Sequence, residues 1–163
     1  MAKIETLRDL LIDELMDLYN AEQQLVKALP KMANAANNED LKDGFTEHLA
    51  QTEGHVERLE QVFGLLEAPV KGKKCKAMEG LIAEGEEKID EDASATLKDA
   101  ALICAAQKVE HYEIAGYGTV RTFAEVLGYD DIVSILQETL DEESETDETL
   151  TAIASSINAE LQP

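Results

Sequence analysis

Three glutamates occupy positions where the hydrophobic pattern of this sequence calls for an apolar side chain, and a fourth lies beside one of them. Glu113 is at the centre of an apolar stripe in residues 102–127 that recurs every three or four positions, the period of one helix face. Glu110 lies one turn earlier, at the edge of that stripe. Glu22 and Glu143 lie within two other stripes. A carboxylate that leaves water in such a position costs several kcal/mol unless a partner neutralises it.

The sequence offers few cations for this purpose. Its three arginines are Arg8, Arg58 and Arg121, and none lies on a stripe that would face the interior. The carboxylates must therefore take up protons, join a structural network of hydrogen bonds, or bind a metal ion. Carboxylates with one or two imidazoles suit iron or manganese better than copper or a structural zinc. We favour a dinuclear iron site, with manganese as the alternative metal.

Four long amphipathic segments carry these residues. They cover residues 4–36, 39–66, 96–127 and 131–159, and a shorter helix is expected at 77–89. The first and last pairs of long helices are joined by very short links, which makes the members of each pair antiparallel, and a longer crossover joins the pairs. The sequence therefore predicts an all-α fold, a ferritin-like antiparallel four-helix bundle with a short extra helix in the crossover.

Several residues are expected to begin, end or bend these helices. Asn38 and Asp130 are predicted N-caps, and Thr96 with Asp99 three residues later resembles a capping box. Gly128 is a predicted helix stop. Pro30 is expected to kink the first helix because it cannot donate a backbone hydrogen bond.

Counting residues from the two short links places the polar groups at matching depth. Glu22 lies 31 positions before Glu53, and Glu113 lies 30 positions before Glu143. His55 is near the depth and face of Glu22, and Asp147 lies one turn after Glu143 on the flank of its stripe. The candidate metal ligands are thus Glu22, Glu53, His55, Glu110, Glu113, Glu143 and Asp147.

Other reactive side chains have simpler interpretations. His48 lies on the inner side of its helix but about two turns from the expected depth, so we expect a hydrogen-bonded core histidine. His111 points away from its stripe, and Tyr117 is expected to fill the core. Cys75 and Cys104 have no Cys or His partner at metal-binding spacing.

Composition narrows the class of protein. The 163 residues carry a net charge of −21, which excludes nucleic acid and anionic membranes as expected partners. No segment is apolar enough to span a membrane, and the N-terminal residues lack the apolar core of a signal peptide, so we expect none. Two cysteines suit a reducing compartment better than a disulfide framework. We expect one cytoplasmic domain covering residues 1–163.

The sequence resembles the YciE/YciF family of bacterial stress-response proteins, within the ferritin-like superfamily. The resemblance covers nearly the whole chain and is carried by residues 19–25 (YNAEQQL), 54–59 (GHVERL), 74–82 (KCKAMEGLI), 105–115 (AAQKVEHYEIA) and 138–143 (ETLDEE). It implies a homodimer and a dinuclear metal site like that of rubrerythrin.

This resemblance also implies a pattern of ligands. Glu22 matches the single glutamate of the first helix, and Glu110 and Glu113 match the pair on the third. On the fourth helix Glu143 matches, but Thr146 or Asp147 stands where a histidine is usual. The second helix lacks the usual Glu-x-x-His, so its ligand is left open.

Two classes of function follow. The first is a stress-response protein whose dinuclear centre reacts with peroxide or O₂, as a peroxidase or ferroxidase does. It would need an external electron donor, since two cysteines cannot form a rubredoxin-like iron centre. The alternative is a non-catalytic, stress-induced structural or binding protein with a structural or vestigial metal site. No feature indicates the interface of a ferritin storage cage.

Overall fold

The computed structural model describes residues 4–162, and all the regular structure in that range is helical. The all-helical class expected from the sequence is confirmed. The elements are α1 (Leu7–Ala35), α2 (Glu39–Leu65), α3 (Lys76–Asp90), α4 (Ala95–Val126) and α5 (Asp130–Glu160). Within the described range, no helix is both long and apolar enough to cross a membrane.

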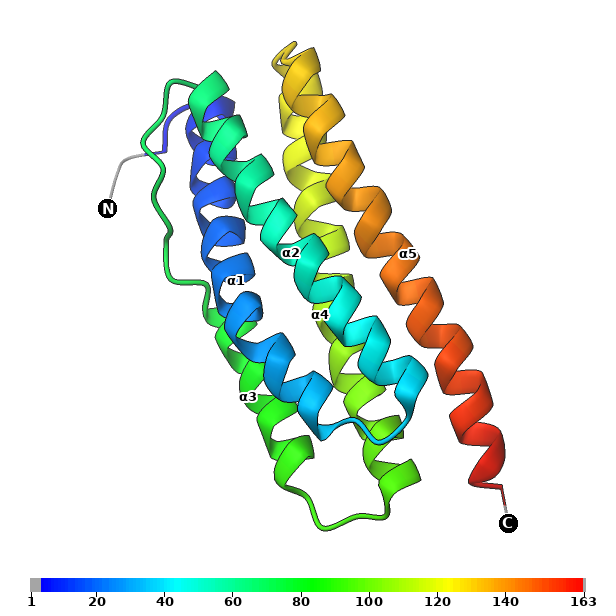
Figure 1. The fold of residues 1–163 in the computed structure, drawn as a ribbon. Helices are drawn as coiled ribbons and strands as arrows, with labels where there is room; N and C mark the ends of the chain where they lie inside the picture. Colours follow the sequence, from blue (N-terminus) through cyan, green and yellow to red (C-terminus); the bar gives the residue numbers. More distant parts are fainter. Residues whose placement is uncertain (1–3, 163) are drawn as a thin grey trace.

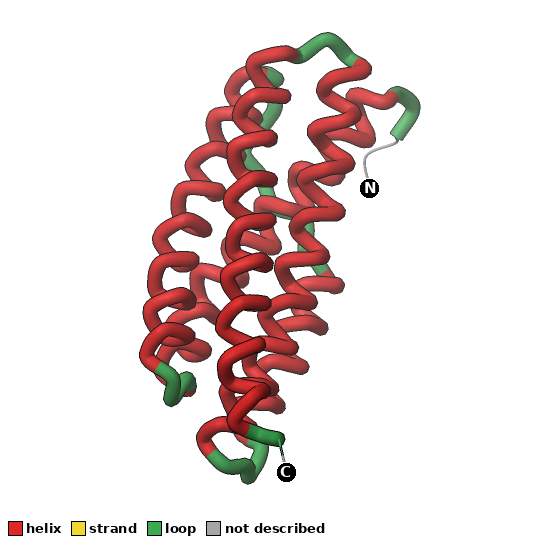
Figure 2. The backbone as a smooth tube through the Cα atoms, turned by 90° about the vertical axis from the view of Figure 1, so that its right-hand side faces the viewer, coloured by secondary structure: helices red, strands yellow, loops and turns green. Residues whose placement is uncertain are grey.

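The four long helices lie lengthwise against one another (Figures 1 and 2). α1 packs on α2 and α4 packs on α5, while α2·α5 and α1·α4 contacts join the two pairs. Residues 66–75 run back along α1, where the Lys73 N–H donates to the Met16 carbonyl at 2.9 Å. This return path allows α3 to pack against α1 and α4, and α4 then starts beside the α1–α2 turn (Figure 1).

Two of the expected helix signals act as predicted. The Asn38 side chain accepts a hydrogen bond from the Leu41 N–H at 3.0 Å and caps α2. Gly128 follows α4 with a φ of 75°, a conformation that side chains disfavour and glycine adopts readily. α1 continues through Pro30 as one helix.

Two other expected caps were wrong. Ser94, rather than Thr96, caps α4 by accepting from the Leu97 N–H. Tyr129 takes the N-cap position of α5 without a side-chain hydrogen bond, and Asp130 is already helical. In both cases the helix begins one or two residues before the position that the pattern indicated.

Asp99, expected in the wrong capping box, instead closes the α1–α2 turn from a neighbouring helix. Its carboxylate is buried and accepts hydrogen bonds from the backbone N–H groups of Asn37 and Asn38, each at 2.8 Å. One side chain on α4 thus holds the turn that joins the first two helices.

We expect Asp99→Ala to lower the free energy of unfolding by about 3 kcal/mol, because it leaves two backbone donors without their charged acceptor. Chemical denaturation of the metal-free protein measures this change. Asp92→Ala, which removes an exposed carboxylate from the preceding loop, is the matched control and should change stability by less than about 0.5 kcal/mol. Equal effects in the two variants would contradict this role of Asp99.

The apolar interior is divided into two clusters. One contains residues toward the α1–α2 turn, including Leu25, Leu29, Phe45 and Leu102. The other contains residues toward the opposite end, including Leu11, Phe63, Val120 and Leu136. Near the middle of each long helix, where its contributions to the two clusters meet, lie buried polar side chains: Glu22, His48, Thr52, His55, Glu110, Glu113, Thr139 and Glu143. A polar layer therefore crosses the core at mid-length.

Candidate metal centre

Six ionisable side chains from all four long helices form the polar layer, and they fall into two groups. In the first, one ligand atom each from His48, Glu110, Glu113 and Glu143 lie within 4.8 Å of one another. In the second, atoms of Glu22, His55 and Glu143 do the same. Glu143 belongs to both groups, so the two candidate sites share a carboxylate.

His48 contributes an imidazole to the first group. Its Nε2 lies 3.4 Å from Glu110 Oε1 and 3.7 Å from Glu143 Oε2. On the other side of the ring, Nδ1 contacts Gln51 Oε1 and Thr146 Oγ1, each at 3.2 Å. The Gln51 oxygen can only accept, so Nδ1 donates to it, and Nε2 is the ring atom that faces the carboxylates.

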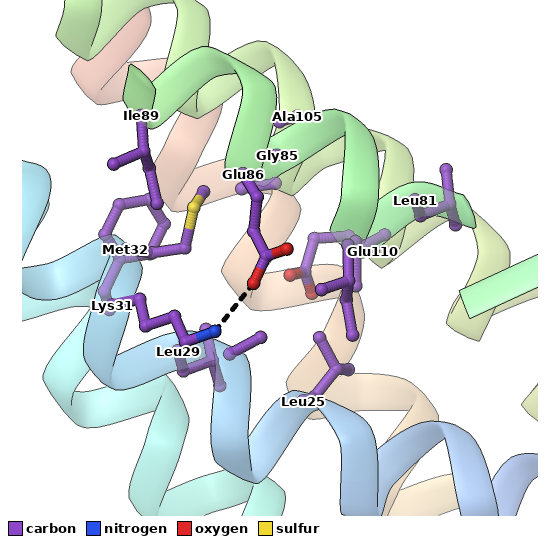
Figure 3. Close-up of a pocket in the computed structure, with 15 residues that line it drawn as sticks. Leu25, Leu29, Lys31, Met32, Leu81, Gly85, Glu86, Ile89, Ala105 and Glu110 are labelled. Atoms are coloured by element: carbon purple, nitrogen blue, oxygen red, sulfur yellow. Dashed lines mark hydrogen bonds and ion pairs between the residues drawn. The ribbon is translucent and has the colours of Figure 1, made fainter. Parts of the chain in front are cut away.

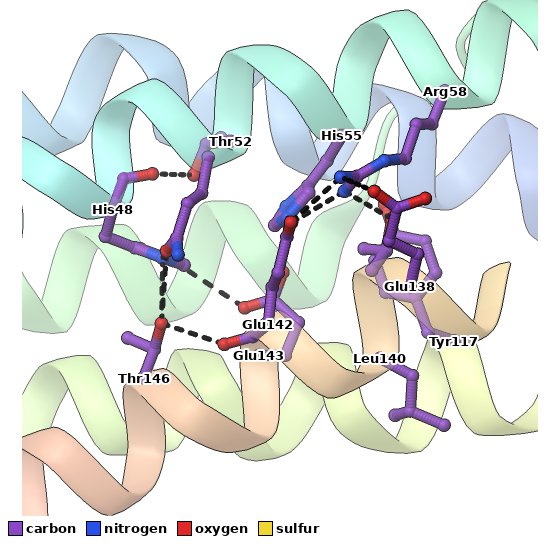
Figure 4. A network of polar contacts seen from close by, with 12 residues as sticks. His48, Thr52, His55, Arg58, Tyr117, Glu138, Leu140, Glu142, Glu143 and Thr146 are labelled. Atoms are coloured by element: carbon purple, nitrogen blue, oxygen red, sulfur yellow. Dashed lines mark hydrogen bonds and ion pairs between the residues drawn. The ribbon is translucent and has the colours of Figure 1, made fainter. Parts of the chain in front are cut away.

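His55 is held in a similar way in the second group. Its Nδ1 lies 3.0 Å from Glu143 Oε1 and 3.4 Å from Glu22 Oε1, without the angles of a hydrogen bond. Its Nε2 donates to Glu142 Oε2 at 2.8 Å. Arg58 in turn donates to both oxygens of Glu142, at 2.6 and 2.8 Å (Figure 4). The outer carboxylate thus orients the ring and leaves Nδ1 facing inward.

Polar atoms without hydrogen bonds gather in this layer. In the described residues, nine buried side-chain nitrogen and oxygen atoms have no partner; one is Arg121 Nε, and the other eight belong to these six side chains. Both oxygens of Glu113 and both of Glu143 are among them. Native proteins pair nearly all such atoms, so these atoms are available to a common partner. Carboxylate and imidazole atoms converging in this way fit a divalent iron or manganese ion.

The charges of the metal-free layer follow from burial and proximity. Burial raises the pKa of Glu110 and Glu113 well above the usual range, and repulsion from Glu143 adds to it. Burial acts on Glu143 too, but the facing imidazoles outweigh it and lower the pKa. Burial opposes the charged form of His55, yet contacts with Glu143 and Glu22 raise the pKa to about 10. Without metal, burial therefore favours the protonated form of Glu110 and Glu113, and the neighbouring carboxylates favour the charged form of His55.

This balance corrects one expectation from the sequence. We expected no cation from the protein near the carboxylates, but His55 supplies one, and Arg58 lies just outside the layer against Glu142. Arg58 is on the flank of α2, and its long side chain reaches Glu142 on α5. The apolar periodicity of α2 alone could not predict this contact. Tyr117, for which a core position was favoured over donation to a carboxylate, is buried and donates a hydrogen bond to Glu22 Oε1.

The structure brings together most of the predicted ligands. Glu22, His55, Glu110, Glu113 and Glu143 all lie in the two groups. Glu53 does not, because it is one position away from the inner face that Thr52 and His55 occupy, and its side chain is exposed. Asp147 does not either. It accepts from Gln107 Nε2 at 3.1 Å and lies 3.3 Å from His111 Nε2.

His48 and Glu142 are the residues that the sequence argument missed. His48 was placed two turns from the expected depth because the counting assumed a single layer of ligands. The layer is longer than that, and His48 with His55, seven residues apart, share one face of α2. That spacing of two turns could have identified the pair. No sequence pattern identified Glu142, because its role depends on its contacts with His55 and Arg58 on α2.

These features define a helical protein whose long helices enclose a shared carboxylate–imidazole cluster. The chain belongs to the family described as a domain of unknown function, DUF892, whose profile matches residues 6–162. It is 49% identical over 152 residues to Protein YciF of Escherichia coli K12, covering 93% of this chain and 92% of that protein. The family that the sequence motifs suggested is therefore confirmed.

Solved structures agree with this assignment. The crystal structure of the E. coli stress protein YciF matches with a TM-score of 0.93 and 48% identity, over 96% of this chain and 99% of that one. YcfI of Rhodopseudomonas palustris, provisionally described as a structural protein, matches with a TM-score of 0.89 and 49% identity, over 91% and 95% of the chains. A Xanthomonas campestris protein shares the fold at 21% identity, with a TM-score of 0.73 over 94% of each chain.

Proposed function

We propose that this chain is a ferritin-like stress protein that binds two iron or manganese ions in its polar layer. The observation that carries this proposal is the set of eight buried, unpaired atoms on six side chains. A shared cation would satisfy them together, because nearly all are acceptors. The arrangement of four long helices with a crossover helix supports the ferritin-like assignment.

Each group would hold one ion. His48, Glu110 and Glu113 would bind the first, Glu22 and His55 the second, and Glu143 would serve both. Such a pair supplies two electrons, one from each metal, to peroxide or O₂. The chain's own residues orient the ligands: Tyr117 holds Glu22, and Glu142 holds His55. Glu110 and Glu113 store protons that must leave when metal enters.

The second candidate is a structural protein without turnover. It is supported by the metal-free charge balance described above, and by the provisional description of the R. palustris relative. In that case His55 and the protonated glutamates would stabilise one another without metal. A catalytic centre differs in that it keeps an open coordination position and is oxidised by peroxide.

Metal content distinguishes the two. Elemental analysis of protein purified from iron- and manganese-supplemented cultures should give about two ions per chain, and peroxide should then oxidise the bound metal. Glu113→Ala should lose metal, whereas Glu53→Ala, an exposed glutamate on α2, should keep it. Folded protein with no bound metal in any preparation would refute the metal centre and favour the structural role.

We expect Glu142→Gln to weaken metal binding by about 10- to 100-fold, because His55 loses the carboxylate that fixes its orientation and basicity. Competition with a chelator measures the affinity. Glu138→Gln is the matched control: Glu138 also pairs with Arg58, at 2.7 Å, but is not a partner of His55. An equal loss of affinity in the control would assign the effect to Arg58 instead.

We further propose that the protein is a cytoplasmic homodimer that takes electrons from an external donor. The homodimer is what the resemblance to the YciE/YciF family implies. Sedimentation equilibrium would measure the mass, and a single-chain value at micromolar concentration would contradict the dimer.

A further inference from the structure

Two pockets flank the polar layer, and both reach Glu110. The first lies between α2 and α5, has a volume of about 110 Å³, and is lined by polar side chains including His48, Gln51 and Thr146. The second lies among α1, α3 and α4 and has a volume of about 40 Å³ (Figure 3). Phe45 and Glu110 belong to both linings, so the pockets approach the same carboxylate from different sides.

The smaller pocket is apolar along most of its length. Its walls include Leu25, Leu29 and Val109. The Lys31–Glu86 ion pair, at 2.6 Å and with side chains 61% and 49% exposed, lines its solvent end (Figure 3). Glu110, which is 2% exposed, lines its buried end. The pocket is therefore a short apolar path from the surface to the candidate metal centre.

Size and polarity select what this path can admit. One water molecule needs roughly 10–15 Å³ of such volume, so about 40 Å³ accommodates a diatomic molecule but no metabolite. Apolar walls offer water and hydrogen peroxide few hydrogen bonds, and apolar cavities tend to stay dry while binding nonpolar gases. Hydrated ions and peroxide are better suited to the polar pocket beside His48.

We propose that the pocket among α1, α3 and α4 delivers dioxygen to the Glu110 side of the metal centre. This inference rests on the proposed function, with ferrous iron as the metal. Two ferrous ions held by these residues would supply the two electrons, and solvent the two protons, that reduce O₂ to H₂O₂. The pocket separates this nonpolar oxidant from the polar species that the other pocket admits.

Gly85 offers a way to close the path. A Cβ added there would lie 3.8 Å from Met32 Sδ and 3.9 Å from Ala105 Cβ, two residues of the pocket wall, so Gly85→Leu places a side chain in the pocket. Gly80 is on the same helix with no atom within 4 Å of its added Cβ and is absent from the lining. Gly80→Leu is therefore a matched control for the change in helix propensity.

Xenon tests the pocket without any metal. Crystals of the metal-free protein under xenon pressure should show one bound atom among Leu25, Val109 and Gly85. The atom should be lost in Gly85→Leu and kept in Gly80→Leu. If Gly85→Leu does not fold, Ala105→Val narrows the same pocket and should reduce xenon occupancy. Absence of xenon from the wild-type pocket would overturn the proposal.

Oxidation kinetics test the delivery itself. In iron-loaded protein, Gly85→Leu should slow oxidation by O₂ at least tenfold and change oxidation by H₂O₂ less than twofold, and Gly80→Leu should change neither. Equal slowing with both oxidants, or none with O₂, would overturn the dioxygen path while leaving the metal centre intact. Failure of the wild type to bind iron would overturn the proposed function, and this inference with it.

Discussion

Glu113→Gln should make the metal-free protein more stable while weakening its metal binding at least 100-fold. Glu113 is fully buried, and neither of its oxygens has a hydrogen-bond partner. Burial, with repulsion from Glu143, raises its pKa well above the usual range. The folded state thus holds this proton more tightly than the unfolded chain does. Its stabilising contribution is complete below the unfolded pKa of about 4.3 and is lost as pH rises toward the raised value.

The neutral amide carries no such dependence on pH. The gain in the free energy of unfolding should therefore be near zero at pH 4 and reach about 2 kcal/mol at pH 8, the order expected when a strained buried acid is replaced. Urea denaturation of metal-free protein across this range measures it, and Glu53→Gln serves as the exposed control. A loss of stability at pH 8 would mean that the Glu113 carboxylate has a partner in the folded chain and is not reserved for metal.

A substitution that raises the free energy of unfolding but weakens ligand binding is typical of functional sites, where a residue is suited to the ligand at the expense of stability. A core designed for stability alone would place leucine or methionine at position 113. A carboxylate at this buried position is thus consistent with a bound cation.

The helices were predictable because each depends on its own segment of sequence. The apolar period of 102–127 and the cap at Asn38 act within one or two turns, so α2 and α4 were placed within a residue or two. Asp99 was misread because its partners, Asn37 and Asn38, lie in the turn between two other helices. A local pattern cannot indicate that the best donors lie across a helix interface.

The same limit applies to the metal site. Glu22, Glu113 and Glu143 were identified because an acid within an apolar stripe is anomalous in the stripe alone. His48 was discounted because its depth depends on how α2 slides along α5, where Thr146 meets its ring. Glu53 was included because one residue of rotation about α2 decides between the core and solvent. Which face of a helix is buried, and how far it is shifted along its neighbour, are decided by the packing of the helices and cannot be read from one segment alone.

Glu143→Gln should act on stability in the opposite direction to Glu113→Gln and should remove both metal ions. Contacts with His55 and His48 lower the pKa of Glu143 despite its burial. Its contribution to stability is therefore present above the unfolded pKa of about 4.3 and is lost as pH falls through the lowered value. Without the Glu143 charge, the buried His55 cation has one fewer carboxylate beside it. This should lower the free energy of unfolding by about 3 kcal/mol at pH 7.

Because Glu143 belongs to both ligand groups, the loss of metal should be complete rather than half. Elemental analysis of Glu143→Gln should give less than about 0.2 ions per chain, against about one in Glu22→Gln, which changes only the second group. Retention of a single ion in Glu143→Gln would show that the groups do not share this carboxylate.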